Sequence, residues 1–381
     1  MEFKKLTALL DRLPNDVGIP GCECIVHYKG KEVFHHAAGW RDVEAGEPVH
    51  PGDHYFLYSA SKPATCAAAL QLVEKGDLLL DDPIGEWLPA FKEMDVLVQD
   101  ALGNTHTEKA KNPITVRHLF SMSAGLDYDL DAPAILAARQ APGATTQSVV
   151  AAMAEKPLHF EPGTHWNYSL CHDVLAALVE AVSGERFADY VQKHIFAPCG
   201  MTESYYHMTP ELEGKIAPQY RFNEETQKAE RVPTTNGYVF TPDYDSGGAG
   251  VVSTLRDYAK FVEAMCHKGL AATGERILSP QGVNLMRTNM LCEEALKDVN
   301  WSQLAGYGYG LGVRTMMNPG VGGSLGPVGE FGWGGAAGAY IMIDPDNELS
   351  LFYVQHMLNN KEPYIHPRLR NALYADMADT L

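Results

Sequence analysis

The fold is decided by the stretch Tyr55-Phe56-Leu57-Tyr58-Ser59-Ala60-Ser61-Lys62-Pro63-Ala64. An extended segment passes here into a helix that we expect from about Ser61 to Lys75, with a proline in its first turn and Gly76 after its end. Ser59 then lies at a helix N-terminus, where free N–H groups and the positive end of the helix dipole stabilise a developing alkoxide. Lys62 lies one turn further along the same face, and a buried lysine can accept a proton from serine.

This S-x-x-K element is weak evidence when taken alone. The chain holds 14 serines and 17 lysines, so about 0.6 such matches arise by chance. The ordinary alternative is a serine that caps a helix beside a solvated lysine, and the motif by itself favours that alternative.

A second element is Glu161-Pro162-Gly163-Thr164-His165-Trp166-Asn167-Tyr168-Ser169. Pro-Gly predicts a turn, and Tyr168 follows it at the start of an amphipathic helix expected over 171–182. A phenol near a lysine ammonium has a lowered pKa and can carry protons to and from a serine oxygen. The alternative is an aromatic side chain that only packs at a helix start.

A third element is Phe331-Gly332-Trp333-Gly334-Gly335-Ala336-Ala337-Gly338, which runs into a strand predicted over 339–343. Small residues let a substrate lie against the backbone. The amides of Ala336 and Ser59 could together form an oxyanion hole. The alternative is a glycine-rich bulge that binds nothing.

In this order and spacing, the three elements resemble the serine β-lactamase-related family of class C β-lactamases, low-molecular-weight penicillin-binding peptidases and family VIII carboxylesterases. Further segments that resemble the family lie at 76–83, 118–126 and 247–254. The resemblance implies that Ser59 is acylated, that Lys62 and Tyr168 form the general-base pair, and that the Ser59 and Ala336 amides hold the oxyanion.

The resemblance also implies an α/β (α+β) fold of the β-lactamase/transpeptidase type. A central antiparallel sheet flanked by helices would come from residues 1–82 and 246–381, with a mainly helical insertion at 83–245. Hairpin patterns near both ends of the chain agree with this: 22–28 with 32–37, and 339–343 with 349–354. A short amphipathic helix is expected at the start and another helix from about Pro367 to Asp379. The glycine-rich stretch 302–338 is expected to be loop.

Two departures from the family pattern bear on the substrate. The third position of the family's Tyr-x-Asn motif is Leu170, which cannot hydrogen-bond a substrate amide, and Trp333 replaces the cation of Lys-Thr-Gly. We therefore predict that Leu170, Trp333, Gly334 and Gly335 line a substrate site suited to simple esters.

Three functions follow as hypotheses. The first is a carboxylesterase-like serine hydrolase that acts on a small-molecule ester or amide. The second is a β-lactamase or D-Ala-D-Ala carboxypeptidase of the penicillin-binding type, and the third is a non-catalytic binding protein that retains the pocket. A rival nucleophile is Ser324 in Gly322-Gly323-Ser324-Leu325-Gly326, but that motif works only between a strand and a helix, and here glycines and prolines surround it.

Composition limits the other possibilities. The net charge of −18 disfavours nucleic acid and anionic membrane partners. The seven cysteines are scattered, no histidine cluster has metal-ligand spacing, and no signal peptide or membrane span is evident. We expect a cytoplasmic enzyme with reduced thiols and neither metal nor cofactor. The pattern predicts no oligomeric state.

Overall fold

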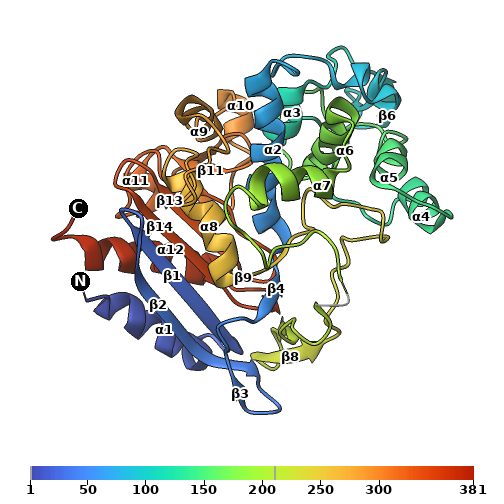
Figure 1. Cartoon of the computed structure of the whole chain (residues 1–381). Coiled ribbons are helices and arrows are strands. Elements are labelled where there is room, and N and C mark those ends of the chain that lie inside the picture. The colour runs from blue at the N-terminus through green and yellow to red at the C-terminus, as the bar shows by residue number, and fades with distance from the viewer. Residues whose placement is uncertain (1, 210–211) are drawn as a thin grey trace.

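The centre of the computed structural model, which describes residues 2–209 and 212–381, is an eight-stranded antiparallel sheet (Figure 1). The strand order is β10-β11-β12-β13-β14-β1-β2-β3. The hairpin of β1 (Gly21–Tyr28) and β2 (Lys31–Asp42) joins the hairpin of β13 (Tyr340–Asp344) and β14 (Leu349–Val354), because β1 pairs with β14. The predicted antiparallel sheet built from both ends of the chain is confirmed.

Helices cover both faces of this sheet (Figure 1). Alternate side chains of β1 serve the two faces: Cys24 and Val26 pack in the cluster with α1 (Lys4–Asp16) and α12 (Glu362–Met377), and Ile25 packs in the cluster with α8 (Leu255–Cys266). The two terminal helices also bind each other. The Asp376 carboxylate accepts hydrogen bonds from the Lys5 and Leu6 amides, both at 2.9 Å, and so caps the first helix from the last.

The expected start of the C-terminal helix at Pro367 is wrong. Helix α12 begins at Glu362, and Pro363 occupies its first turn, where a missing N–H costs no intrahelical bond. Pro367 lies inside the helix. Pro363 therefore lies at the start of α12, and Pro367 is tolerated in its interior.

The expectation of loop over 302–338 is also wrong in part. This stretch contains the strands β10 (Tyr307–Tyr309), β11 (Arg314–Met316) and β12 (Phe331–Gly332), which extend the main sheet beyond β13. It also contains the short helix α11 (Pro319–Gly322). Strands of two or three residues between glycines are too short to show an alternating pattern. Each of them is set by pairing with the neighbouring strand rather than by local sequence.

Between the two halves of the sheet, the chain forms a region of helices and small sheets. Its helices are α3 (Val116–Phe120), α4 (Pro133–Gln140), α5 (Thr146–Met153), α6 (Cys171–Ser183) and α7 (Phe187–Val191). Its hairpins are β5 (Asp95–Gln99) with β6 (Thr105–Lys109), and β7 (Gln219–Asn223) with β8 (Lys228–Val232). The late strand β15 (Met357–Leu358) adds to β7 in parallel, so this small sheet also contains C-terminal residues. The remaining elements are β3 (Glu47–Pro48), β4 (His54–Phe56), β9 (Val252–Thr254), α9 (Pro280–Met286) and α10 (Glu293–Leu296).

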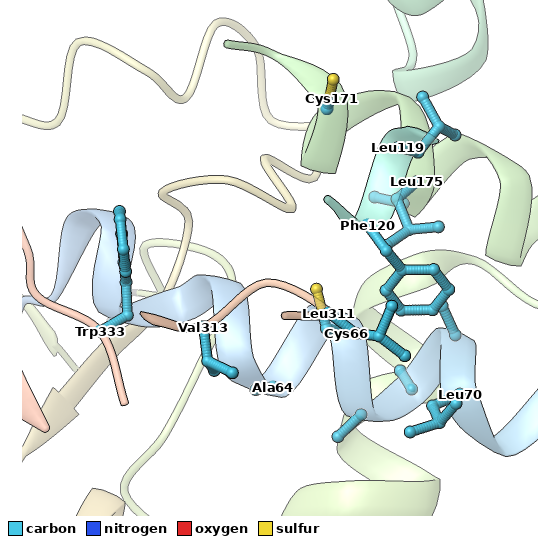
Figure 2. Close-up of a cluster of buried hydrophobic side chains, with 14 of the residues drawn as sticks. Ala64, Cys66, Leu70, Leu119, Phe120, Cys171, Leu175, Leu311, Val313 and Trp333 are labelled. Carbon is cyan, nitrogen blue, oxygen red and sulfur yellow. The ribbon is translucent and has the colours of Figure 1, made fainter. Parts of the chain in front are cut away.

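Helix α2 (Lys62–Lys75) ends at Gly76, as its sequence predicted. It is buried along most of its length, and Gly76 adopts the left-handed conformation. Figure 2 shows side chains of several segments around it, with Phe120 and Leu175 beside its later turns and Trp333 beside its first turn. This rigid support fixes the N-terminal end of α2. Among the described residues, no helix combines the length and apolar character needed to cross a membrane.

Candidate active site

Ser59 lies in a tight 3-10 turn, Tyr58–Ser61, between strand β4 and helix α2. The turn is held by the Leu57 amide, which donates to the Val251 carbonyl at 2.9 Å, and by pairing of β4 with β9. Tyr58 has φ +48°, an unusual value for a residue with a side chain. The strained turn leaves Ser59 partly exposed while Lys62 has no exposed surface.

The structure brings Ser59, Lys62 and Tyr168 into mutual contact. The Tyr168 hydroxyl lies 2.6 Å from Ser59 Oγ, and Lys62 Nζ lies 3.1 Å from the same oxygen. Tyr168 reaches the serine from the segment that precedes α6, far along the chain. Both groups lie within hydrogen-bond distance of Ser59 Oγ, so the geometry allows a proton to pass between the serine and Tyr168 beside the lysine.

Lys62 Nζ also has two further neighbours that accept hydrogen bonds. It donates to the Gly248 carbonyl at 2.8 Å and to the Tyr128 hydroxyl at 3.3 Å. Together with Ser59 Oγ these make three acceptors, which match the three donors of an ammonium group. Nζ also lies 4.7 Å from the centre of the Tyr168 ring. The arrangement suits Lys62 as a fixed positive charge and Tyr168 as the group that moves the proton.

Asp173 supplies a buried negative charge behind Lys62. Its side chain is 2% exposed and accepts hydrogen bonds from the Tyr244 and Ser246 hydroxyls, both at 2.8 Å. A Cβ added to Gly248 would lie 2.6 Å from Asp173 Oδ2 and 3.3 Å from Lys62 Nζ, so both charged groups flank this glycine. Burial raises the pKa of Asp173, and the Lys62 charge and the hydroxyl donors oppose that rise.

Trp333 contacts Tyr168 directly. The indole N–H donates to the Tyr168 hydroxyl oxygen at 3.3 Å, and the two ring centres are 5.7 Å apart. Trp301 packs edge-on against Tyr168 with ring centres at 5.2 Å. Trp333 stands where the family has a cation, and it donates a neutral hydrogen bond to Tyr168, the residue that transfers the proton.

The Ser59 and Ala336 amides are available as an oxyanion hole, because neither donates to any acceptor in the described parts of the chain. A Cβ at Gly335 would lie 2.2 Å from the Leu57 carbonyl oxygen, so the turn that carries Ala336 packs directly on the segment before Ser59. The Asn360 side chain donates to the Gly335 and Ala336 carbonyls at 2.9 and 3.1 Å and fixes the turn from its other side.

Ser59 opens into a cavity of about 1080 Å³. Its lining includes Ala336 and the predicted substrate residues Trp333, Gly334 and Gly335. The prediction that Leu170 lines the substrate site is wrong. Leu170 is 3% exposed, belongs to the hydrophobic core, precedes α6 as its N-cap and is not among the residues that line the cavity.

The rival nucleophile Ser324 lies apart from this site. It follows helix α11 in an exposed loop, does not line the cavity, and its hydroxyl accepts the Gly326 amide at 3.0 Å. No strand enters the motif directly, as a nucleophile elbow requires.

The sequence alone does not predict several residues of the site. Gly248 lies within the 247–254 segment that resembles the family, but its contact with Lys62 follows only from the structure. Tyr128, Asp173 and Asn360 carry no motif of their own. Asp173 lies five residues after Tyr168 and on the following helix, which was the only available signal.

The fold and the Ser-Lys-Tyr site define a class of serine hydrolases and acyltransferases built on the β-lactamase fold. Comparison with known proteins agrees: the Beta-lactamase family model matches residues 6–375, and the chain belongs to this family. Protein Rv1367c of Mycobacterium tuberculosis is 30% identical over 351 residues, which cover 90% of this chain and 87% of that one.

Two further relatives carry functional names. Esterase EstB of Burkholderia gladioli is 26% identical over 400 residues, which cover 97% of this chain and 95% of that one. The solved structure of EstCE1, described as a hydrolase with promiscuous acyltransferase activity, has a TM-score of 0.80 and 25% identity, covering 97% of this chain and 98% of that one.

Proposed function

We propose that this protein is a carboxylesterase-like serine hydrolase that works through an acyl-enzyme on Ser59. The observation that carries the proposal is the position of Ser59 Oγ, 2.6 Å from the Tyr168 hydroxyl and 3.1 Å from Lys62 Nζ, in the lining of a cavity of about 1080 Å³. The names of EstB and EstCE1 support the same reaction class.

The reaction begins when Ser59 Oγ adds to the ester carbonyl and passes its proton to Tyr168. Tyr168 accepts this proton as a phenolate, which the Lys62 ammonium and the Trp333 indole N–H stabilise, and the transfer leaves Tyr168 as the neutral phenol. The carbonyl oxygen takes up the negative charge and is bound by the Ser59 and Ala336 amides. Collapse of this intermediate breaks the bond to the alcohol, which leaves with the proton from Tyr168. Water then repeats the sequence and releases the acid.

The replacement of polar groups in the site supports esters over β-lactams. Trp333 is neutral where the family uses a cation that pairs with a substrate carboxylate, and Leu170 is turned into the core where the family uses an amide. Neither change removes a group from the reaction described above. The aromatic side chains around Tyr168 also favour an apolar substrate portion.

Kinetics on Ser59→Ala test the proposal. The wild-type protein should hydrolyse 4-nitrophenyl esters and be labelled by a fluorophosphonate probe at Ser59, and the variant should lose both properties while its circular dichroism stays unchanged. Ser324→Ala is the matched control and should retain activity. Activity that survives in Ser59→Ala would overturn the proposal.

Faster turnover of nitrocefin or a D-Ala-D-Ala peptide than of esters would favour the β-lactamase or carboxypeptidase alternative. No labelling of the wild-type protein by the fluorophosphonate probe would favour a binding protein.

A cytoplasmic location is part of the same proposal. All seven cysteines are free thiols, and six of them are buried, as expected for a protein that keeps its cysteines reduced. Cell fractionation with antibodies against the protein tests this, and recovery from the culture medium or the periplasm would contradict it.

A further inference from the structure

A second, smaller cavity adjoins the first at the reaction centre. Its volume is about 520 Å³, and the residues that line both cavities are Leu130, Tyr238, Ala336 and Asn359. Ala336 carries one of the two oxyanion amides, so the second cavity starts beside the point where the ester carbonyl must lie. We call this second cavity the acyl groove.

The position of Tyr168 decides which part of an ester enters each cavity. Tyr168 and Ser59 line the first cavity and do not line the second. Because Tyr168 must give its proton to the departing alcohol oxygen, the alcohol portion has to leave on the Tyr168 side, into the first cavity. The oxyanion binds the Ser59 and Ala336 amides. The acyl chain then extends in the remaining direction, past Ala336 and Tyr238 and into the acyl groove.

The acyl groove is mixed in chemistry. Tyr58 contributes to it, and the Tyr58 hydroxyl accepts a hydrogen bond from Gln219 at 2.7 Å, which ties the residue before the nucleophile to strand β7. Its aliphatic side chains are Leu130, Val232, Pro233, Ala336 and Leu358.

Arg221 on strand β7 is the only charged residue in the lining of the acyl groove as far as the described residues show. Its guanidinium is exposed, and it makes no hydrogen bond or ion pair within the described parts of the chain. Glu230 lies opposite Arg221 in the strand register, but its carboxylate is bound by the Asn223 side-chain amide at 2.9 Å and the Thr226 hydroxyl at 3.0 Å. A guanidinium with unused donors at the side of an apolar groove is suited to a carboxylate on a short chain.

We propose that the acyl groove selects acyl chains that end in a carboxylate, so that the preferred substrates are monoesters of dicarboxylic acids, with Arg221 as the selecting residue. This inference rests on the proposed function, because it assumes an acyl-enzyme at Ser59. In the reaction, Ser59 Oγ bonds to the ester carbon, the alcohol leaves with the Tyr168 proton, and water then releases the dicarboxylic acid. The distal carboxylate stays ionised on Arg221 throughout and takes no part in bond changes.

The test compares matched esters in wild-type protein and in Arg221→Gln. One pair carries the charge on the acyl side: mono-4-nitrophenyl adipate against 4-nitrophenyl hexanoate. The other carries it on the alcohol side: 4-acetoxybenzoate against phenyl acetate. The measured quantity is the ratio of kcat/KM for the charged ester to kcat/KM for the neutral ester within each pair.

We expect Arg221→Gln to lower the acyl-side ratio by about fivefold, the size of an exposed charge pair, and to leave the alcohol-side ratio unchanged. The matched control is Arg231→Gln on the neighbouring strand, whose arginine binds Asp42 at 2.9 Å and lines neither cavity. The control should not change either ratio.

The outcomes separate the two proposals. A wild-type protein that hydrolyses the neutral esters, but whose acyl-side ratio is the same in Arg221→Gln, would overturn the selection by Arg221 and leave the proposed function standing. A fall in the alcohol-side ratio instead would show that the two cavities are assigned the wrong way round. A wild-type protein that hydrolyses none of the esters would overturn both proposals.

Discussion

Tyr168 has one hydrogen-bond donor at its hydroxyl and one cation beside its ring. Trp333 donates a neutral indole N–H to its oxygen at 3.3 Å, and the Lys62 ammonium lies 4.7 Å from the centre of its ring. Both interactions strengthen when the phenol gives up its proton. At the scale of single residues, the site thus replaces the cation of related sequences with a hydrogen bond to the proton carrier itself.

Trp333→Phe tests this hydrogen bond. Phenylalanine keeps an aromatic ring but removes the donor, and hydrogen bonds to charged groups are worth more than neutral ones, so we expect kcat for 4-nitrophenyl esters to fall about tenfold or more. Trp301→Phe is the comparison, because Trp301 touches the Tyr168 ring but makes no hydrogen bond to its hydroxyl. An equal loss of kcat in both variants would mean that ring packing alone matters.

Asp173→Asn tests the charge behind Lys62. Asparagine keeps the shape and can still accept from Tyr244 and Ser246, but it removes the negative charge that helps to hold the ammonium in place. We expect kcat to fall about tenfold while KM and the melting temperature change little, because Asp173 acts through Lys62 and does not line the cavity. A rise in KM with unchanged kcat would contradict this positioning role.

At the scale of elements, catalysis depends on how closely the Gly335 turn meets the turn that carries Ser59. Gly335→Ala puts a methyl group 2.2 Å from the Leu57 carbonyl oxygen, and neither backbone can yield locally. The Ala336 amide must then move away from the oxyanion, and we expect kcat/KM to fall about a hundredfold. In the control Gly52→Ala, the nearest atom lies at 3.8 Å, and activity should be retained.

The helices and strands that the sequence alone could predict have long strand-forming or helix-forming runs, or residues that mark where the element begins and ends. The β1–β2 and β13–β14 hairpins have strand-forming runs on both sides of a turn, and α2 is bounded by Pro63 and Gly76. Strands β10 to β12 could not be predicted, because each has two or three residues and forms only by pairing with its neighbour.

Some residues of the active site can likewise be predicted from local sequence motifs, and others cannot. Ser59, Lys62 and Tyr168 lie in motifs whose order is informative, so they could be named before the structure was known. Tyr128 and Asn360 reach the site only because distant segments pack there, and no local pattern marks them. Leu170 was misplaced because a motif position states which residue is present and not which way its side chain points.

At the scale of the whole molecule, Asp245 joins separate segments through one buried carboxylate. It accepts hydrogen bonds from the Arg186 guanidinium at 3.1 Å and the Ala188 amide at 2.9 Å, and it pairs with His207 at 2.9 Å. Burial alone would raise the pKa of Asp245, but His207 and Arg186 outweigh burial, so the pKa lies below its ordinary value of 3.8.

Asp245→Asn should therefore lower the free energy of unfolding by about 3 kcal/mol near pH 7, since it leaves the partners of a buried charge without an anion. A carboxyl whose pKa is depressed by folding contributes stability above its unfolded pKa and loses it as the pH falls through the folded value. Urea titrations at several pH values measure the difference in free energy of unfolding between wild type and variant. This difference should be constant from pH 7 down to about 3.8 and should shrink at lower pH. A difference that grows with acid would contradict the assignment.

The pairing of β1 with β14 has a consequence for synthesis on the ribosome. The first hairpin ends at Asp42 and its partner strand β14 begins only at Leu349, so at roughly 5–20 residues per second the hairpin waits for a time on the order of tens of seconds. During that wait β1 is an unpaired edge with apolar residues on both faces, which is the kind of surface that chaperones cover. A circular permutant that joins α12 to α1 through a short linker, and places β13 and β14 ahead of β1, would remove the wait and should fold with less help from chaperones.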